Sequence, residues 1–89
     1  MSEPAETRLK RLRMRSWRRG IREMDLILGD FADAGLAALG EADLALYDAL
    51  LSENDHDLYA WVSGAAAVPD RYAGLIARIA VSAGLPRSA

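Results

Sequence analysis

Apolar residues recur at spacings of three and four along nearly the whole chain of 89 residues, and no stretch alternates convincingly with a period of two. This periodicity is typical of amphipathic helices that bury one face, and it argues against strands. Glycine and proline interrupt the pattern often enough to keep each helix short. The sequence therefore predicts an all-α fold, a compact five-helix antiparallel bundle. The expected helices span about residues 4–19, 21–33, 41–51, 55–63 and 69–83.

Local signals set the limits of these helices and of the domain. Asp55 is expected to cap the N-terminus of the fourth helix, and Gly64 is expected to end that helix. A chain this short has room for one domain, so residues 1–89 are assigned to a single helical domain. Residues 1–5 and 85–89 are expected to be flexible, as chain ends often are.

The residue types that are missing exclude several kinds of site. The chain has no cysteine and one histidine, His56. Disulfides, thiolate metal sites and a cysteine nucleophile are excluded, and a histidine-based metal cage would lack partners. No apolar run approaches the ~18–20 residues that cross a membrane, and the N-terminus lacks the apolar core of a secretory signal. We therefore expect neither a metal site nor membrane insertion.

Charge is distributed very unevenly along the chain. Eight of the eleven basic residues lie between Arg8 and Arg22, whereas the segment from Glu23 to Asp57 holds ten acids and no lysine or arginine. If the first helix continued, arginines at spacings of three and four would share one face. This basic stripe consists of Arg8, Arg11, Arg15, Arg18 and Arg22.

The basic stripe has three interpretations: a surface for a protein partner, a solvated helix face, or a nucleic-acid surface. The sequence pI near 5.3 argues against nucleic acid, as does the lack of a second basic cluster to neutralise a run of phosphates. No recognition helix with base-reading residues is evident either. The composition favours contact with a protein.

The stretch "RRGIREMD", residues 18–25, places a glycine among three arginines and two acids. Gly20 would cost about 1 kcal/mol against alanine inside a helix, and an Arg19–Glu23 pair would return only ~0.2–0.5 kcal/mol. Local stability therefore explains the stretch poorly. A glycine lets another backbone come close, so Gly20 indicates either a docking point for a partner, flanked by Arg19 and Glu23, or close packing between two helices.

Other candidate residues have simpler explanations. The acids of the second helix, such as Asp30 and Asp33, could suggest paired carboxylates, but no pocket is implied and a solvated face explains them better. His56 is expected to lie at the surface in the first turn of its helix. Trp17 precedes two arginines, and it suits either the core or an interaction surface. No catalytic residue is predicted.

With these residues in view, the sequence resembles the SdhE family, the FAD assembly factors (flavinylation factors) of succinate dehydrogenase, which include mitochondrial counterparts. "RRGIREMD" matches the RGxxE motif of that family. "YDALLSENDHDLYAWVSG" looks like the acidic turn and tryptophan segment that follow it in the family. The chain departs from the family at His56, where proline commonly stands between two aspartates.

The resemblance implies an assembly factor and not an enzyme. Members bind the flavoprotein subunit of succinate dehydrogenase transiently and promote covalent attachment of FAD to it, and in bacteria also to that of fumarate reductase. FAD is then the cofactor of the partner, and this chain would bind no cofactor stably. The resemblance also implies a location in the bacterial cytoplasm, or in the mitochondrial matrix if the source is eukaryotic.

The RGxxE match falls on Arg19, Gly20 and Glu23, with Arg18 and Asp25 beside it, and these are the expected partner-binding residues. Weaker candidates for the same surface are Arg15, Trp17, Arg22 and Asp55.

Two other classes of protein remain open at this point. One is a small helical nucleic-acid-binding regulator that uses the stripe from Arg8 to Arg22. The other is an antitoxin-like or ribosome-associated adaptor with an unrelated protein partner. A small enzyme has no supporting residues.

Overall fold

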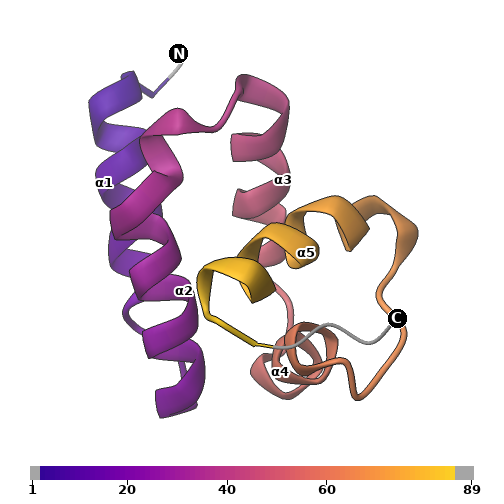
Figure 1. The fold of residues 1–89 in the computed structure, drawn as a ribbon. Coiled ribbons are helices and arrows are strands. Elements are labelled where there is room, and N and C mark those ends of the chain that lie inside the picture. Colours follow the sequence, from indigo (N-terminus) through magenta and orange to yellow (C-terminus); the bar gives the residue numbers. More distant parts are fainter. Residues whose placement is uncertain (1–2, 86–89) are drawn as a thin grey trace.

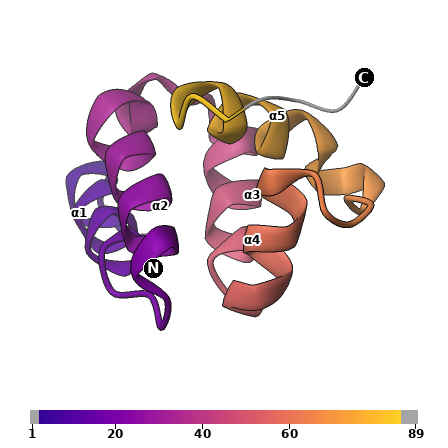
Figure 2. The ribbon, with the colours of Figure 1, turned by 60° about the horizontal axis from the view of Figure 1, so that its bottom comes forward.

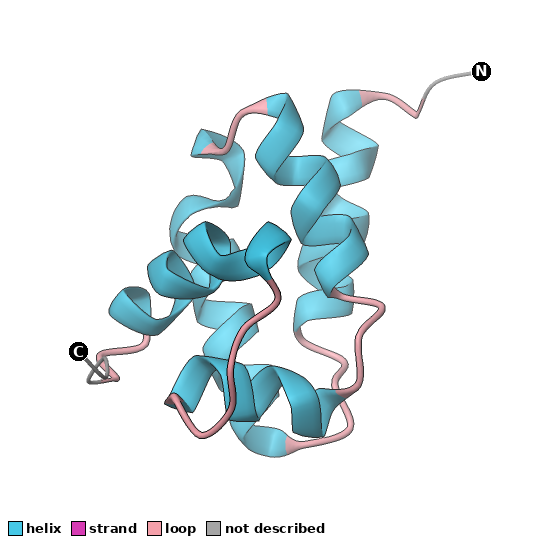
Figure 3. Ribbon diagram, turned by 90° about the vertical axis from the view of Figure 1, so that its right-hand side faces the viewer, coloured by secondary structure: helices cyan, strands magenta, loops and turns pink. Residues whose placement is uncertain are grey.

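The computed structural model describes residues 3–85, and these contain helices, turns and loops but no strand (Figures 1 and 3). The prediction of an all-α fold built on five main helices is confirmed. In chain order the elements are α1 (Ala5–Ser16), α2 (Arg22–Gly35), the 3-10 helix η1 (Leu36–Ala38), α3 (Glu41–Leu50), α4 (Asp55–Ser63), the 3-10 helix η2 (Asp70–Tyr72) and α5 (Ala73–Ser82).

The helices α1 and α2 form an antiparallel pair, joined by a loop of residues 17–21 (Figures 1 and 2). After η1, α3 runs beside this pair, and a loop of residues 51–54 leads into α4. The last helix, α5, packs against both α2 and α4. As a result, the 17–21 loop and the 51–54 loop come to the same end of the bundle.

One apolar core holds the helices together, and every main helix contributes to it. Each fully buried large apolar side chain adds roughly 1.5–3 kcal/mol relative to exposure, so this core is the main source of stability. Its large side chains are those of Leu12, Met24, Leu28, Phe31, Leu36, Leu39, Tyr47, Leu50, Leu51, Leu58, Tyr72, Leu75, Ile76 and Ile79.

The first helix ends at Ser16 and not at Arg19, so the predicted boundary was three residues too long. The helix ends there because the backbone amides of residues 19 and 20 bond to side-chain acceptors. Arg19 N–H donates to the carboxylate of Asp25, and Gly20 N–H donates to that of Asp55, so neither bonds to a helical carbonyl. Side-chain acceptors of this kind compete with the helix for backbone donors.

Asn54, not Asp55, caps the N-terminus of α4, which corrects the predicted cap. The Asn54 side chain accepts a hydrogen bond from the backbone N–H of His56 at 2.8 Å. Asp55 is the first residue of the helix, and its carboxylate faces the 17–21 loop instead. The predicted stop at Gly64 is confirmed by its left-handed conformation, with φ of 85°.

The ends of the chain lie partly outside the described residues, so the expectation of flexible ends stays a prediction. Within the described part, the Glu3 carboxylate accepts hydrogen bonds from Arg11. None of the helices in residues 3–85 is long and apolar enough to cross a membrane.

Candidate docking site

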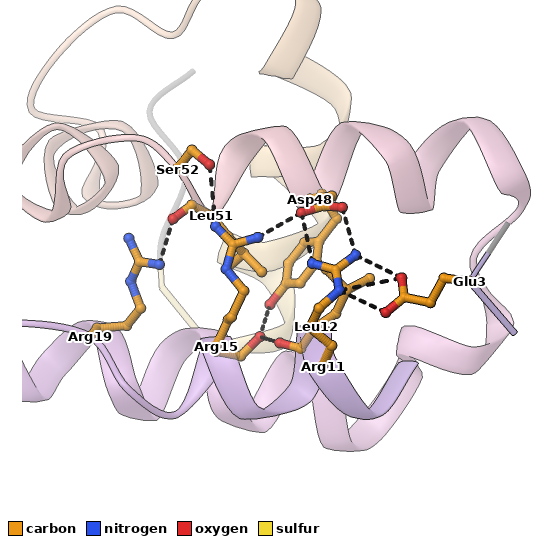
Figure 4. Close-up of polar contacts among 10 residues, drawn as sticks. Glu3, Arg11, Leu12, Arg15, Arg19, Asp48, Leu51 and Ser52 are labelled. Atoms are coloured by element: carbon orange, nitrogen blue, oxygen red, sulfur yellow. Dashed lines mark hydrogen bonds and ion pairs between the residues drawn. The ribbon is translucent and has the colours of Figure 1, made fainter. Parts of the chain in front are cut away.

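Arg19 fastens the 17–21 loop to the connection between α3 and α4. Its Nε donates to Oδ1 of Asp55 at 2.7 Å. Its two terminal nitrogens donate to the backbone carbonyls of Leu51 at 2.7 Å and Glu53 at 3.1 Å, and Figure 4 shows the contact with Leu51. The side chain is only 10% exposed. The guanidinium is therefore largely committed to acceptors within its own chain.

The Asp55 carboxylate binds the 17–21 loop with both oxygens. While Oδ1 accepts from Arg19, Oδ2 accepts from the backbone N–H of Gly20 at 2.6 Å. A Cβ placed on Gly20 would lie 3.1 Å from the same Oδ2, which is tighter than ordinary van der Waals contact. The close approach that the glycine indicated is therefore made, within this chain, by a carboxylate and not by a second backbone.

Asp25 and Glu23 have different roles, although both were predicted to bind the partner. Asp25 is half-buried, and its Oδ1 accepts a hydrogen bond from the backbone N–H of Arg19. Glu23 is exposed on the first turn of α2. Arg19 lies outside the helix, so the two do not form the pair on one helix face that their spacing suggested.

The exposed part of this region consists of Arg18, Gly20, Arg22 and Glu23. Within residues 3–85, the side chains of Arg18, Arg22 and Glu23 make no hydrogen bond or ion pair. These three charged residues lie on either side of Gly20 in the sequence, and contacts of Arg19, Asp25 and Asp55 hold the 17–21 loop in place. The docking role of all these residues stays a prediction, but their division into exposed and anchoring residues is a property of the fold.

The basic stripe is not a free cationic surface. Arg8 pairs with Glu41 at 2.6 Å, and Arg15 pairs with Asp48 at 2.6 Å. Arg11 bridges two acids, with 3.0 Å contacts to both Glu3 and Asp48, as Figure 4 shows. The stripe also ends with α1, so Arg22 does not continue it. Three of the five arginines of the basic stripe, Arg8, Arg11 and Arg15, thus join α1 to α3.

These ion pairs shift the pKa values of their members. Hydrogen bonding to Arg11 holds the pKa of the Asp48 carboxyl below its usual range, and the charges of Arg11 and Arg15 add to this shift. The Arg11 hydrogen bond likewise lowers the pKa of Glu3. The same bonds raise the pKa of Arg11. The arrangement favours the charged forms, as expected of a structural ion-pair network.

A shallow groove of about 430 Å³ runs along the outer face of α1 toward the 17–21 loop. Met14 is a large apolar residue on this face and is 46% exposed. The groove extends the exposed face of the loop along the helix. Its lining residues are Thr7, Lys10, Arg11, Met14, Arg15, Arg18 and Arg19.

Trp17 lies between the core and the surface, since it is 38% exposed and its ring covers Gly29 of α2. Sequence reasoning missed Gly29, and it also missed Ser16, a buried residue whose hydroxyl donates to the Leu12 carbonyl at 2.8 Å. The Ser16 hydroxyl lies 2.6 Å from that of Tyr47, which joins α1 to α3 beneath the site. A serine next to an apolar stripe carries no sequence signal for such a contact.

The described residues contain no group of three or more histidine, aspartate or glutamate side chains arranged to hold a metal ion. The fold and the 17–21 loop together define a small helical protein with a charged loop at one end of its bundle, held in place by contacts from Asp25 and Asp55. The chain matches, over residues 10–82, the model of the protein family described as the flavinator of succinate dehydrogenase. It belongs to this family, which confirms the resemblance seen in the sequence.

Curated relatives agree with this membership. The chain is 42% identical over 72 residues to succinate dehydrogenase assembly factor 2-B, mitochondrial, of Drosophila mojavensis, a match that covers 79% of this chain and 46% of the relative. It is 39% identical over 75 residues to succinate dehydrogenase assembly factor 2, mitochondrial, of Saccharomyces cerevisiae, covering 81% and 46%. The chain thus spans a little under half the length of these relatives.

Proposed function

We propose that this protein is an assembly factor that binds the flavoprotein subunit of succinate dehydrogenase and promotes covalent attachment of FAD to it. Membership of the flavinator family supports a role in the attachment of FAD to succinate dehydrogenase. The loop around Gly20, which Arg19 and Asp55 hold in place, supports a docking role. The partner would contact Arg18, Gly20, Arg22 and Glu23, which are exposed and carry both signs of charge.

In this proposal the attachment chemistry belongs to the flavoprotein and its FAD. The factor holds the subunit in a conformation that favours the reaction, and it is not itself a catalyst. Two of the acids at the site, Asp25 and Asp55, are engaged in hydrogen bonds and an ion pair that support the loop. Cofactor chemistry generally resides in the cofactor, while protein groups supply orientation and electrostatics.

The factor would act in the compartment where the flavoprotein subunit receives FAD, which for the named relatives is the mitochondrion. The flavoprotein subunit of fumarate reductase would be a second partner, to which FAD is attached in the same way. Nucleic-acid binding is not proposed, because Arg8, Arg11 and Arg15 of the stripe are paired with acids of the same chain.

The test is reconstitution of covalent flavin on the purified flavoprotein subunit with FAD, read by flavin fluorescence after denaturing electrophoresis. Reactions would contain the wild-type chain, no chain, the Gly20→Arg variant or the Gly40→Arg variant. Gly40 is a matched control, since it is an exposed glycine with open space around it at the opposite end of α3. Circular dichroism would show that both variants are folded.

We expect covalent flavin with the wild-type chain and with Gly40→Arg, and little with Gly20→Arg or with no chain. The new arginine at Gly20 would obstruct the exposed face and compete with Arg19 for Asp55. Equal flavin in all four reactions would overturn the proposal. Equal activity of the two glycine variants would retain the function but remove Gly20 from the docking surface.

A further inference from the structure

We propose that Asp55 is a positioning residue, whose carboxylate selects the docking conformation of the 17–21 loop without contacting the partner. This inference rests on the proposed function, because it concerns how the same site is prepared for binding. Its basis is the paired contact of Asp55 with the Arg19 side chain and the Gly20 backbone.

The 17–21 loop has few contacts of its own that could fix its shape. The amides of Trp17 and Arg18 make long bonds of 3.2 and 3.4 Å to the last turn of α1. The next two amides, those of Arg19 and Gly20, bond only to carboxylates, from Asp25 and Asp55. The loop shape at Gly20 is therefore set from outside the loop.

Asp55 supplies the contact that comes from a distant part of the sequence. It lies 35 residues from Gly20 in sequence, at the start of α4, and two oxygens of one rigid carboxylate hold a side chain and a backbone amide together. This geometry fixes the position of Gly20 relative to Arg19. Charge-assisted bonds of this kind are about twice as strong as neutral ones.

The surroundings make this contact costly to lose. The side chains of Arg19 and Asp55 are only 10% and 15% exposed, so water reaches them poorly. Removing the carboxylate would leave a largely buried guanidinium with only the carbonyls of Leu51 and Glu53 as acceptors. An uncompensated charge in such a place drives rearrangement, and the loop is the part that can move.

Asp55 also lies behind the exposed surface and not on it. Its Oδ2 lies against Gly20, on which even a Cβ would come within 3.1 Å of that oxygen. A partner that approaches Gly20 from the exposed side would meet the glycine and its charged neighbours first. The influence of Asp55 on binding would thus pass through Arg19 and Gly20.

Positioning has a quantitative signature that direct contact lacks. If only a fraction of the molecules holds the docking conformation, the apparent Kd rises by the inverse of that fraction, while the bound complex is unchanged. A loop that keeps its shape about one tenth of the time would raise the half-saturating concentration about tenfold. The maximal flavinylation rate at saturation would stay the same.

The experiment compares Asp55→Ala, Asp55→Asn and a matched control, Asp57→Ala, in the full chain. Asp57 is an exposed acid in the same first turn of α4, so its loss reproduces the change in charge near the helix N-terminus. Three quantities would be measured: amide hydrogen exchange at Gly20 by NMR, the Kd for the purified flavoprotein subunit, and the rate of flavinylation against factor concentration.

For Asp55→Ala we expect faster exchange at Gly20 and a roughly tenfold higher Kd and half-saturating concentration, with an unchanged maximal rate. Asp55→Asn should give exchange and Kd values between those of the wild type and of Asp55→Ala, because its single amide oxygen can accept only one of the two bonds. Asp57→Ala should match the wild type in all three quantities. If Asp55→Ala does not fold, Asp55→Asn gives the same comparison.

Three results would overturn the inference. The first is an unchanged rate of amide hydrogen exchange at Gly20, together with an unchanged Kd, in both Asp55→Ala and Asp55→Asn. The second is weaker binding with unchanged Gly20 exchange, which would make Asp55 a direct contact. The third is a fall in the maximal rate. Failure of the wild-type chain to bind the subunit would instead overturn the proposed function, and the exchange data would still report whether Asp55 holds the loop.

Discussion

The indole ring of Trp17 lies directly on Gly29, so that a Cβ built on this glycine would meet ring atoms Cδ2 and Cε2 at 2.3 Å. Gly29 is buried within α2, and Trp17 immediately follows α1. Absence of a side chain on one helix thus creates the space for the tryptophan that begins the 17–21 loop. This contact explains a glycine that helix propensity alone would disfavour.

Gly29→Ala should therefore destabilise the protein, although alanine is the better helix former. The new methyl group must displace the ring of Trp17, and overpacking of this kind costs ~1–3 kcal/mol against a helix gain of about 1 kcal/mol. We expect a net loss of about 1 kcal/mol in the free energy of unfolding, measured by urea denaturation, together with altered tryptophan fluorescence.

Gly74→Ala is the control for this prediction. Gly74 lies in α5 with no atom within 4 Å of its hypothetical Cβ. Alanine there should leave stability unchanged or raise it by up to about 1 kcal/mol. If both alanine variants gained stability, the packing of Trp17 on Gly29 would not be a constraint on the fold.

The number and order of the helices could be predicted because the apolar spacing is local information. Gly20 as a break, Gly64 as a helix stop and the apolar faces of α2 and α5 all follow from residues within one or two turns. The mixed charge of the 18–25 stretch likewise marked the region that the fold exposes at one end of the bundle.

The internal partners of that region could not be predicted, because they depend on contacts between segments far apart in sequence. Nothing local indicates that Arg19 meets Asp55 36 residues away, or that Arg11 meets Asp48 37 residues away. Each acid had several basic residues within plausible reach. The same limit explains why the local sequence predicts Asp55 as the cap, a role that Asn54 fills.

Tyr47 should make the fold sensitive to alkali. Its ring is fully buried, and burial raises the pKa of its hydroxyl to about 12. Because the folded pKa is above the unfolded value of about 10, this contribution is present below pH ~10 and is lost as the pH rises toward 12. The free energy of unfolding of the wild type should therefore fall across this interval.

The Tyr47→Phe variant tests this assignment. It loses the contact with Ser16, at a cost of about 1 kcal/mol at neutral pH. It should also show a smaller decline in stability between about pH 10 and 12. Tyr59→Phe, at an exposed tyrosine, is the control and should follow the wild-type decline. Identical slopes for all three proteins would rule out Tyr47 as the group responsible.

The Asp48 carboxylate should contribute to stability above its unfolded pKa and lose that contribution in acid. Its pKa is lowered in the folded state by Arg11, so the stabilisation is complete above about pH 5 and disappears as the pH falls through the folded value. Asp48→Asn should cost about 1 kcal/mol at pH 7, since the ion pairs are partly exposed.

The difference between the wild type and Asp48→Asn should shrink as unfolding is measured at progressively lower pH. Asp30→Asn is the control, at an exposed acid of α2, and should change stability by less than about 0.5 kcal/mol at any pH. A difference that stayed constant between pH 7 and pH 2 would show that Asp48 acts through packing and not through charge.

Arg22 allows docking to be tested apart from stability, because it is exposed and its side chain makes no hydrogen bond or ion pair within residues 3–85. Arg22→Glu should leave the free energy of unfolding within about 0.5 kcal/mol of the wild type. It should slow association with the flavoprotein subunit, and the loss should diminish as salt is added, because charges at a rim act mainly on the association rate. Stopped-flow binding at several ionic strengths measures this association rate.

Arg78→Glu is the control. It makes the same change of charge on α5, where an exposed pair with Asp43 is lost, and should leave the association rate near that of the wild type. Equal slowing by both variants would indicate an effect of net charge and not of the surface around Gly20.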